Sequence, residues 1–428
     1  MSEEKSENAK LTPSLGLFDA TSISVGAIIG AGIFVVTGIV AGFAGSALII
    51  SMIIAAVIAL FTALSFAELT AWQPKEGSIY EYTYTLISPF AGFLVGWMWL
   101  LANTFTGAAV SLGFAYYLTA VFPSLNANVT AATMCIIFTV LNFLGAHQSA
   151  LVNNFLVAAK LLILAFFVVF GLMNVRSANF VPFAPFEVGV FYGACYIFFA
   201  YGGFARVAVL AEEVKDAKRN VPKAILLSLV ISTVVYILVG IVAVGLVGAS
   251  ELANSNSPLA DAINASGSPA AFLIISAGGL LATASVLLTC ILGVSRMAYA
   301  MARRGDIPHK LSELHAKYNT PYYSIWIVGV LMSLLVFFID LSQVVAVSTF
   351  SLLFYYALAN VAALRLETTD RMFPKIVPVL GIVTCMILWF FILFASPRAW
   401  SIGVAALILG AAVYYVAKER KHNILKAT

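Results

Sequence analysis

Two glycine-rich stretches have the residue types and spacing to expose backbone hydrogen-bonding groups. Residues 26–34, GAIIGAGIF, lie inside the first long apolar segment, and residues 198–204, FFAYGGF, lie inside the sixth. Glycine weakens a helix by about 1 kcal/mol relative to alanine and lets the backbone leave helical geometry. In hydrocarbon, an unwound backbone survives only where it is buried in protein or lines a cavity. The glycines therefore predict two broken helices with exposed N–H and C=O groups, and close helix packing through small residues is the alternative interpretation.

Lys160 is the most costly residue of the chain, because it stands in the apolar stretch LVAAKLLIL of residues 156–164. A lysine at mid-helix costs roughly 2.5–3.5 kcal/mol on insertion scales. Ala150 and Asn174, at the two ends of the segment, are roughly 15 and 21 Å away at the helical rise, which is too far for the side chain to reach water easily. Burial disfavours the charged ammonium and brings proton release within physiological reach. We therefore expect Lys160 to have a partner or a functional role.

The composition identifies a polytopic membrane protein that is entirely α-helical. Hydrophobic residues make up 62% of the chain and charged residues only 10%, whereas soluble domains carry roughly 25% charged residues. Apolar runs of about the 20 residues that a transmembrane helix needs recur along the whole chain. The twelve predicted spans cover residues 17–43, 46–71, 89–122, 129–146, 150–174, 188–211, 222–248, 270–300, 323–339, 342–364, 376–396 and 399–417.

The basic residues predict the orientation, because lysine and arginine accumulate in cytoplasmic loops. With a cytoplasmic N-terminus, only Arg176 and Arg398 lie on the outer side. Lys160 and Arg206 lie within spans, and the remaining 19 of the 23 basic residues are cytoplasmic. Twelve spans return the C-terminus to the same side. The net charge of +4 thus reflects topology and indicates no nucleic-acid partner.

No cleavable signal peptide is apparent at the start of the chain. Residues 1–10 are mixed in charge, and the apolar stretch that follows is too long for the core of a cleavable signal peptide. We expect a multi-pass protein with the lipid bilayer around it, and the sequence does not identify protein partners.

The two glycine-rich stretches occupy corresponding positions in two halves of the chain. Span 1 runs from inside to outside, and span 6, five spans later, runs from outside to inside. Broken helices in corresponding positions are typical of inverted-topology repeats with the substrate site at the breaks. The predicted organisation is a cytoplasmic tail 1–14, a first repeat 15–174 (spans 1–5), a second repeat 188–364 (spans 6–10), accessory spans 376–417 and a cytoplasmic tail 418–428.

Four local patterns give further expectations. The polar stripe from Asn103 to Ser111 in span 3 faces a protein interior or serves helix packing. The tyrosines of residues 80–84 anchor the chain in the membrane interface, where aromatic residues concentrate, or belong to a gate-side helix. Residues 259–263 form a short covering helix between spans 7 and 8. Glycine and proline in residues 303–308 predict a sharp helix stop.

Several of these residues also match the pattern of a known family: residues 26–34; 199–204 with 211–214 and 222–225; 295–308; and Lys160. On these pieces, over residues 15–417, the chain resembles the amino acid–polyamine–organocation superfamily of permeases. The likeness is strongest to prokaryotic amino acid permeases related to cationic amino acid transporters. It implies a five-plus-five inverted-repeat fold with broken helices 1 and 6, and transport by alternating access.

The resemblance also implies a substrate site at the two breaks. Backbone N–H groups at the span 1 break would bind the carboxylate of an amino acid, helped by the helix N-terminus beyond the break. Carbonyl groups at the span 6 break would accept hydrogen bonds from its ammonium, and Phe199 could act as a gate. The implied substrate-binding residues are Ile29, Gly30, Ala31, Gly32, Phe199, Ala200, Tyr201 and Gly202.

The resemblance further implies that the coupling ion is a proton. Lys160 matches a span 5 lysine of proton-coupled members, in the region where sodium-coupled relatives hold a cation between spans 1 and 8. Gly26 of span 1 and Ser285 of span 8 complete the implied coupling site, which has no metal ion and no other cofactor. One position departs from the family: Ala205 stands where an acidic residue is frequent.

The resulting hypothesis is a secondary active transporter that imports amino acids by proton symport. No acidic residue lies centrally in a span, since Asp19 and Glu68 are near span ends and Asp340 lies between two spans. A cationic substrate side chain would find no buried carboxylate, so neutral amino acids are favoured. An exchanger or facilitator without proton coupling, and a sensor that does not transport, are the alternatives.

Membrane enzymes and channels are disfavoured by the same residues. A serine–lysine nucleophilic pair with Lys160 is conceivable, but the motifs do not indicate it. The histidines show no HExxH motif, and no charged rings or repeated carbonyl filters of a channel are present. The four histidines are His147, His309, His315 and His422, all in predicted cytoplasmic segments.

Overall fold

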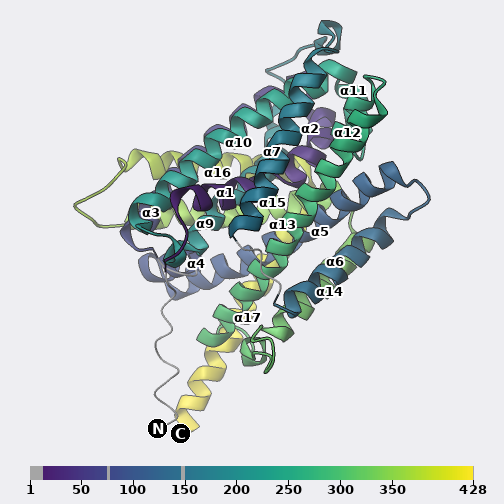
Figure 1. The fold of residues 1–428 in the computed structure, drawn as a ribbon. Helices are drawn as coiled ribbons and strands as arrows, with labels where there is room; N and C mark the ends of the chain where they lie inside the picture. Colours follow the sequence, from purple (N-terminus) through teal and green to yellow (C-terminus); the bar gives the residue numbers. More distant parts are fainter. Residues whose placement is uncertain (1–12, 75–77, 146–149, 428) are drawn as a thin grey trace.

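A computed structural model describes residues 13–74, 78–145 and 150–427. Within these residues the secondary structure is helical (Figure 1). The helices that precede the second half of the chain are α1 (Leu17–Ile28), α2 (Thr37–Ala44), α3 (Leu48–Trp72), α4 (Ser78–Leu86), α5 (Pro89–Val121), α6 (Ala127–Phe143) and α7 (Ala150–Leu172). The later helices are α8 (Val188–Tyr201), α9 (Arg206–Val209), α10 (Ala217–Val247), α11 (Ala249–Ala253), α12 (Pro258–Asn264), α13 (Pro269–Arg304), α14 (Tyr322–Phe338), α15 (Leu341–Arg365), α16 (Ile376–Ala395) and α17 (Pro397–Ala427).

The described part of the chain contains nine helical runs that are long and apolar enough to cross a membrane. One of these runs, Leu17–Trp72, is 56 residues long, which exceeds twice the length of about 20 residues that one span needs. Two further apolar helices, α6 and α14, are shorter. The protein is therefore a multi-pass membrane protein, while the count of twelve spans and the inverted repeat remain predictions.

Side-chain caps explain where several of these helices begin. Ser88 and Ser268 each accept a hydrogen bond from the backbone N–H three residues later, and a proline follows each serine. Asn126 and Asp340 cap α6 and α15 in the same way. Such caps satisfy N–H groups that have no partner within the helix, and proline suits the first helical position. At the other end of α13, Gly305 adopts a φ of 76°, as the predicted helix stop requires.

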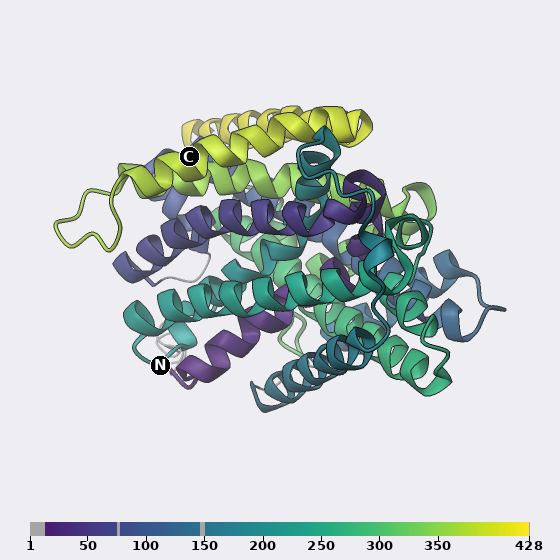
Figure 2. The ribbon, with the colours of Figure 1, turned by 90° about the horizontal axis from the view of Figure 1, so that it is seen from above.

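The centre of the molecule is formed by α5, α13 and α15. The helix α5 packs against both α13 and α15, α3 packs against α10 and α8, and α6 pairs with α14. Figure 2 shows α16 and α17 along one edge of the bundle. Their outward residues are apolar and exposed, as expected for a lipid-facing surface.

Two boundaries differ from the sequence expectations. The seventh span was predicted to begin at residue 222, whereas the helix α10 begins at Ala217. The helix starts earlier because it accommodates Pro222 in its interior. A proline removes one helical hydrogen bond and bends the helix without ending it there. The helix α17 continues to Ala427 through most of the predicted tail 418–428, and the tail 1–14 lies outside the described residues except for its last two. The predicted covering helix is present as α12.

Candidate functional site

The first break lies between α1 and α2. The helix α1 ends at Ile28, and Ile29 is extended with φ −78° and ψ 92°. A π-helical segment then runs over Gly32–Val36 and leads into α2. The first N–H groups of a helix have no partners within that helix, and no described side chain caps this start. The break therefore provides backbone donors beside Gly30 to Gly32.

The second break is tightened rather than unwound. The helix α8 ends at Tyr201 and passes into a 3₁₀ turn over Gly202–Ala205 before α9. The carbonyl of Gly202 accepts a hydrogen bond from the Tyr356 hydroxyl at 3.0 Å. The Phe199 carbonyl accepts from the N–H of Gly202 within the helix end. These carbonyls already have partners, although each oxygen has a second lone pair for a further donor.

The two breaks touch through their backbones. A Cβ atom on Gly32 would lie 2.2 Å from the Cβ of Ala200, and one on Gly203 would lie 2.4 Å from the carbonyl carbon of Ala27. Only glycine permits such an approach. The Tyr236 hydroxyl donates to the Ile28 carbonyl at 2.7 Å and lies 3.3 Å from the Ala200 carbonyl oxygen, so it links both breaks.

A small cavity with a volume of about 40 Å³ lies where the two breaks meet. Most of its lining is apolar, and Arg206 is the one fully charged residue among the lining residues described. Tyr201 does not line the cavity; its hydroxyl lies 3.4 Å from the Met52 carbonyl oxygen instead. The lining residues are Ala27, Ile28, Gly30, Ala31, Gly32, Ala102, Asn103, Thr106, Val110, Phe199, Ala200, Gly202, Gly203, Arg206, Val286, Leu352 and Tyr355.

The structure thus brings together most of the residues implied for substrate binding. Six of them, at positions 30–32, 199, 200 and 202, line the cavity, whereas Ile29 and Tyr201 do not. The polar stripe of span 3 also contributes, because Asn103 and Thr106 face the same cavity.

Lys160 reaches the broken end of α1. Its side chain is 1% exposed, and its Nζ donates to the carbonyls of Gly26 and Ile29, both at 3.1 Å. The last carbonyls of a helix lack partners within the helix and carry partial negative charge. The ammonium of Lys160 therefore caps the C-terminus of α1 directly behind the cavity. The Ser285 hydroxyl donates to the Ala282 carbonyl at 3.0 Å in its own helix, and its part in the coupling site stays a prediction.

Arg206 is a site residue whose position the sequence analysis noted without assigning it a role. It extends from the start of α9 to α13 and α5. Its guanidinium donates to Thr289 Oγ1 at 2.9 Å, to Cys290 Sγ at 3.1 Å and to Asn103 Oδ1 at 3.4 Å. The signal available in the sequence was a basic residue inside a predicted span, next to the glycine-rich break.

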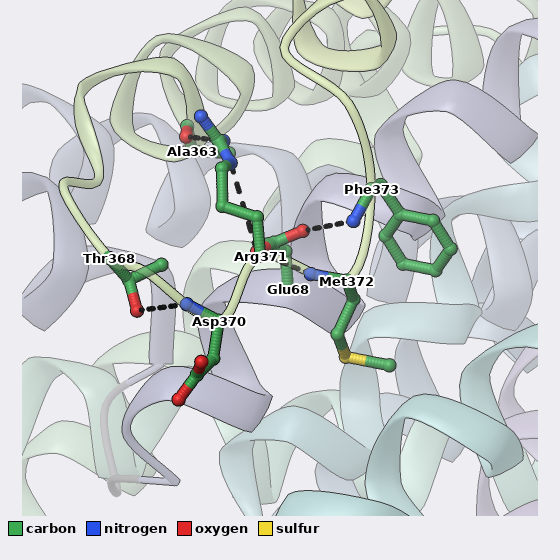
Figure 3. A network of polar contacts seen from close by, with 7 residues as sticks. All are labelled: Glu68, Ala363, Thr368, Asp370, Arg371, Met372 and Phe373. Atoms are coloured by element: carbon green, nitrogen blue, oxygen red, sulfur yellow. Dashed lines mark hydrogen bonds and ion pairs between the residues drawn. The ribbon is translucent and has the colours of Figure 1, made fainter.

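Glu68, near the C-terminal end of α3, is not among the residues that line this cavity. Its carboxylate is 4% exposed and accepts backbone N–H groups of Met372 at 3.0 Å and Phe373 at 2.9 Å. The Nε of Arg371 lies 3.9 Å from the same carboxylate. Figure 3 shows these contacts in the loop that follows α15. The carboxylate of Glu68 is therefore bound by residues 371–373.

The tyrosines of α4 pack inside the protein, and the expectation that they anchor the membrane interface is wrong for Tyr80 and Tyr82, which are buried. The Tyr80 hydroxyl donates to Asp306 Oδ2 at 2.5 Å, and burial together with this carboxylate raises the pKa of Tyr80. Arg304 pairs with Glu81 at 2.8 Å. These contacts attach α4 to the C-terminal end of α13.

Among the residues that the structure describes, no three His, Cys, Asp or Glu side chains gather in a way that could hold a metal ion. His147 lies outside the described residues.

Comparison with known proteins identifies the family of this chain. Residues 15–416 match the family model described as amino acid permease. The chain belongs to this family, within the amino acid–polyamine–organocation superfamily. The permease is a membrane transporter of amino acids and not an enzyme.

Its relatives include several named transporters. A branched-chain amino acid permease of Bacillus subtilis is 31% identical over 449 residues, covering 97% of this chain and 95% of the relative. The methylthioribose transporter of Bacillus subtilis is 30% identical over 450 residues, covering 98% and 96%. Cationic amino acid transporter 4 of Mus musculus is 33% identical over 368 residues, covering 80% of this chain and 58% of the relative.

Proposed function

We propose that this permease imports neutral amino acids by proton symport, with alternating access about the two broken helices. It would reside in the cell membrane with both termini in the cytoplasm, twelve spans and a five-plus-five inverted repeat. The observation that carries the proposal is the contact of Lys160 with the carbonyls of Gly26 and Ile29 at the break in span 1.

Substrate recognition in this proposal uses the backbone of both breaks. The N–H groups of Gly30 to Gly32 bind the substrate carboxylate, because a helix N-terminus favours negative charge. The carbonyls of span 6 accept hydrogen bonds from the substrate ammonium through their remaining lone pairs. Phe199, which lines the same cavity, closes over the bound amino acid.

Coupling in this proposal uses Lys160, the lysine that bonds to this break. A protonated Lys160 donates two hydrogen bonds and holds α1 against α7. Loss of its proton removes the charge and leaves an amine whose two N–H groups are weaker donors to these carbonyls, so α1 can shift relative to α7. Because proton binding stabilises one arrangement more than the other, proton release and conformational exchange become linked.

The preference for neutral substrates rests on the charges at the site. The described lining of the cavity contains no carboxylate, and Glu68 is bound to the 371–373 loop. A cationic side chain would therefore lack a countercharge. The name of one relative, a branched-chain amino acid permease, agrees with this preference, whereas that of cationic amino acid transporter 4 does not.

The test is uptake of a panel of labelled amino acids into sodium-free proteoliposomes under an inward proton gradient. The natural chain is compared with Lys160→Ala and with Lys375→Ala, a control at an exposed lysine. We expect gradient-driven accumulation in the natural chain and the control. In Lys160→Ala we expect at least a tenfold loss of the stimulation, with exchange retained.

Other outcomes would identify the alternatives. Uptake that ignores the gradient in the natural chain would indicate an exchanger or facilitator. Substrate binding with no flux in either direction would indicate a sensor.

A further inference from the structure

Arg206 places an uncompensated charge in the cavity. It is the fully charged residue among the described lining residues, and the other polar groups there belong to neutral side chains and the backbone. The partners of its guanidinium are also neutral: a threonine hydroxyl, a cysteine sulfur and an asparagine oxygen.

A cation at membrane depth ordinarily pairs with a carboxylate, because an unpaired charge is costly there. Arg206 has no ion pair with any carboxylate in the parts of the chain that the structure describes. The residue before Arg206 in the sequence is Ala205, which provides no negative charge. Glu68 accepts its hydrogen bonds from the loop after α15, so it is not available as a countercharge.

This charge acts on whatever shares the cavity. The site is small and mostly apolar, so charges within it interact more strongly, and are screened less by salt, than charges on a surface. A second positive group on the substrate side chain would be repelled. A methyl group at the same place on the substrate would not be repelled, because it is uncharged.

We propose that Arg206 is a specificity-determining residue that excludes amino acids with a cationic side chain. The proposal rests on the proposed function, since it places the amino acid in this cavity. The proposed function explains the exclusion of cationic side chains by the lack of a carboxylate in the cavity. The present proposal adds a second cause, repulsion by the charge of Arg206. Specificity achieved by repulsion can be removed by neutralising one residue.

The experiment compares lysine with norleucine, which carries a methyl group in place of the terminal aminomethyl portion of the lysine chain. Their apparent dissociation constants are measured on the purified full chain by ligand-induced thermal stabilisation. The readout is the ratio of the two constants, in which any common effect of a substitution on binding cancels. The variants are Arg206→Gln, Arg206→Met as a second neutral side chain, and Arg206→Lys as the matched control that keeps the charge.

In the natural chain and in Arg206→Lys, we expect lysine to bind at least tenfold more weakly than norleucine. In the neutral variants, we expect this ratio to fall to about threefold or less. Equal binding of the two ligands by the natural chain, or an unchanged ratio in a folded neutral variant, would overturn the inference alone. A natural chain that binds no amino acid of a broad panel would overturn the proposed function, and the inference with it.

Discussion

The breaks in spans 1 and 6 meet at one cavity but leave their backbone groups in different states. At span 1 the chain is extended at Ile29, and a lysine side chain bonds to the carbonyls that the break frees. At span 6 the helix only tightens into a 3₁₀ turn, and the Tyr356 hydroxyl donates to its Gly202 carbonyl. The Tyr236 hydroxyl lies between the breaks, 2.7 Å from the Ile28 carbonyl oxygen and 3.3 Å from that of Ala200.

The difference separates a partner that can change its charge from partners that stay neutral. A lysine ammonium can lose a proton and with it a donor, whereas a tyrosine hydroxyl keeps its single donor over the physiological pH range. We therefore expect span 1 to respond to protons and span 6 to act as a fixed surface against which it moves.

The largest loss of uptake should come from a substitution that pushes the two breaks apart. In Gly32→Ala, the new Cβ would lie 2.2 Å from the Ala200 Cβ and 2.7 Å from the Ala200 Cα. A contact with backbone cannot be relieved by a rotamer change. We expect uptake to fall at least a hundredfold, measured in proteoliposomes with the amount of folded protein determined in parallel.

Gly42→Ala is the matched control for this prediction. It lies in α2, further along the same span, and its added Cβ would meet the Ala253 Cβ at an ordinary 3.5 Å. We expect uptake within about twofold of the natural chain. If both variants behaved alike, close contact between the breaks would not be the reason for the glycine.

A smaller effect is expected from removing the hydroxyl that links the breaks. Tyr236→Phe leaves the carbonyls of Ile28 and Ala200 without this donor, and an unsatisfied buried group costs about 1–3 kcal/mol. We expect uptake to fall about tenfold. Tyr356→Phe, which affects only the Gly202 carbonyl of span 6, should cost about threefold. A larger loss of uptake in Tyr356→Phe than in Tyr236→Phe would mean that the hydrogen bond to the Gly202 carbonyl matters more for transport than the link between the two breaks.

The smallest effect on transport should come from Glu68, which contacts neither break in the described structure. Glu68→Gln replaces a carboxylate that accepts two backbone N–H groups with an amide that has one oxygen. We expect a lower thermal unfolding temperature, corresponding to about 1–3 kcal/mol, and an unchanged ratio of substrate affinities. Glu367→Gln, at an exposed position before the same loop, is the control and should change neither quantity. A changed affinity ratio in Glu68→Gln would show that this contact reaches the site.

The sequence predicted the helices well because apolar runs of membrane length are a strong signal. It also located the break in span 1, where three glycines fall within seven residues. The tightening at span 6 was not predictable, because the same glycines are compatible with unwinding or with packing. The linking role of Tyr236 depends on a residue 208 positions from Ile28, and such contacts leave no local pattern.

Arg206 illustrates the same limit within the site. Its partners are 83, 84 and 103 residues away in the chain, so the sequence could show a charge in a span but not the cavity that it faces. Ser285 was expected at the coupling site from the resemblance alone. The structure shows its hydroxyl donating to the Ala282 carbonyl of its own helix, and its part in coupling stays a prediction.

The central claim is that the lysine at the span 1 break moves the coupled proton, and proton flux tests it most directly. Proteoliposomes loaded with a pH indicator are given a neutral amino acid in sodium-free buffer without an imposed gradient, and the internal pH is followed. We expect the natural chain to acidify the lumen as substrate enters, and Lys160→Ala to show no substrate-dependent acidification. Acidification that persists in a folded Lys160→Ala protein would contradict the account.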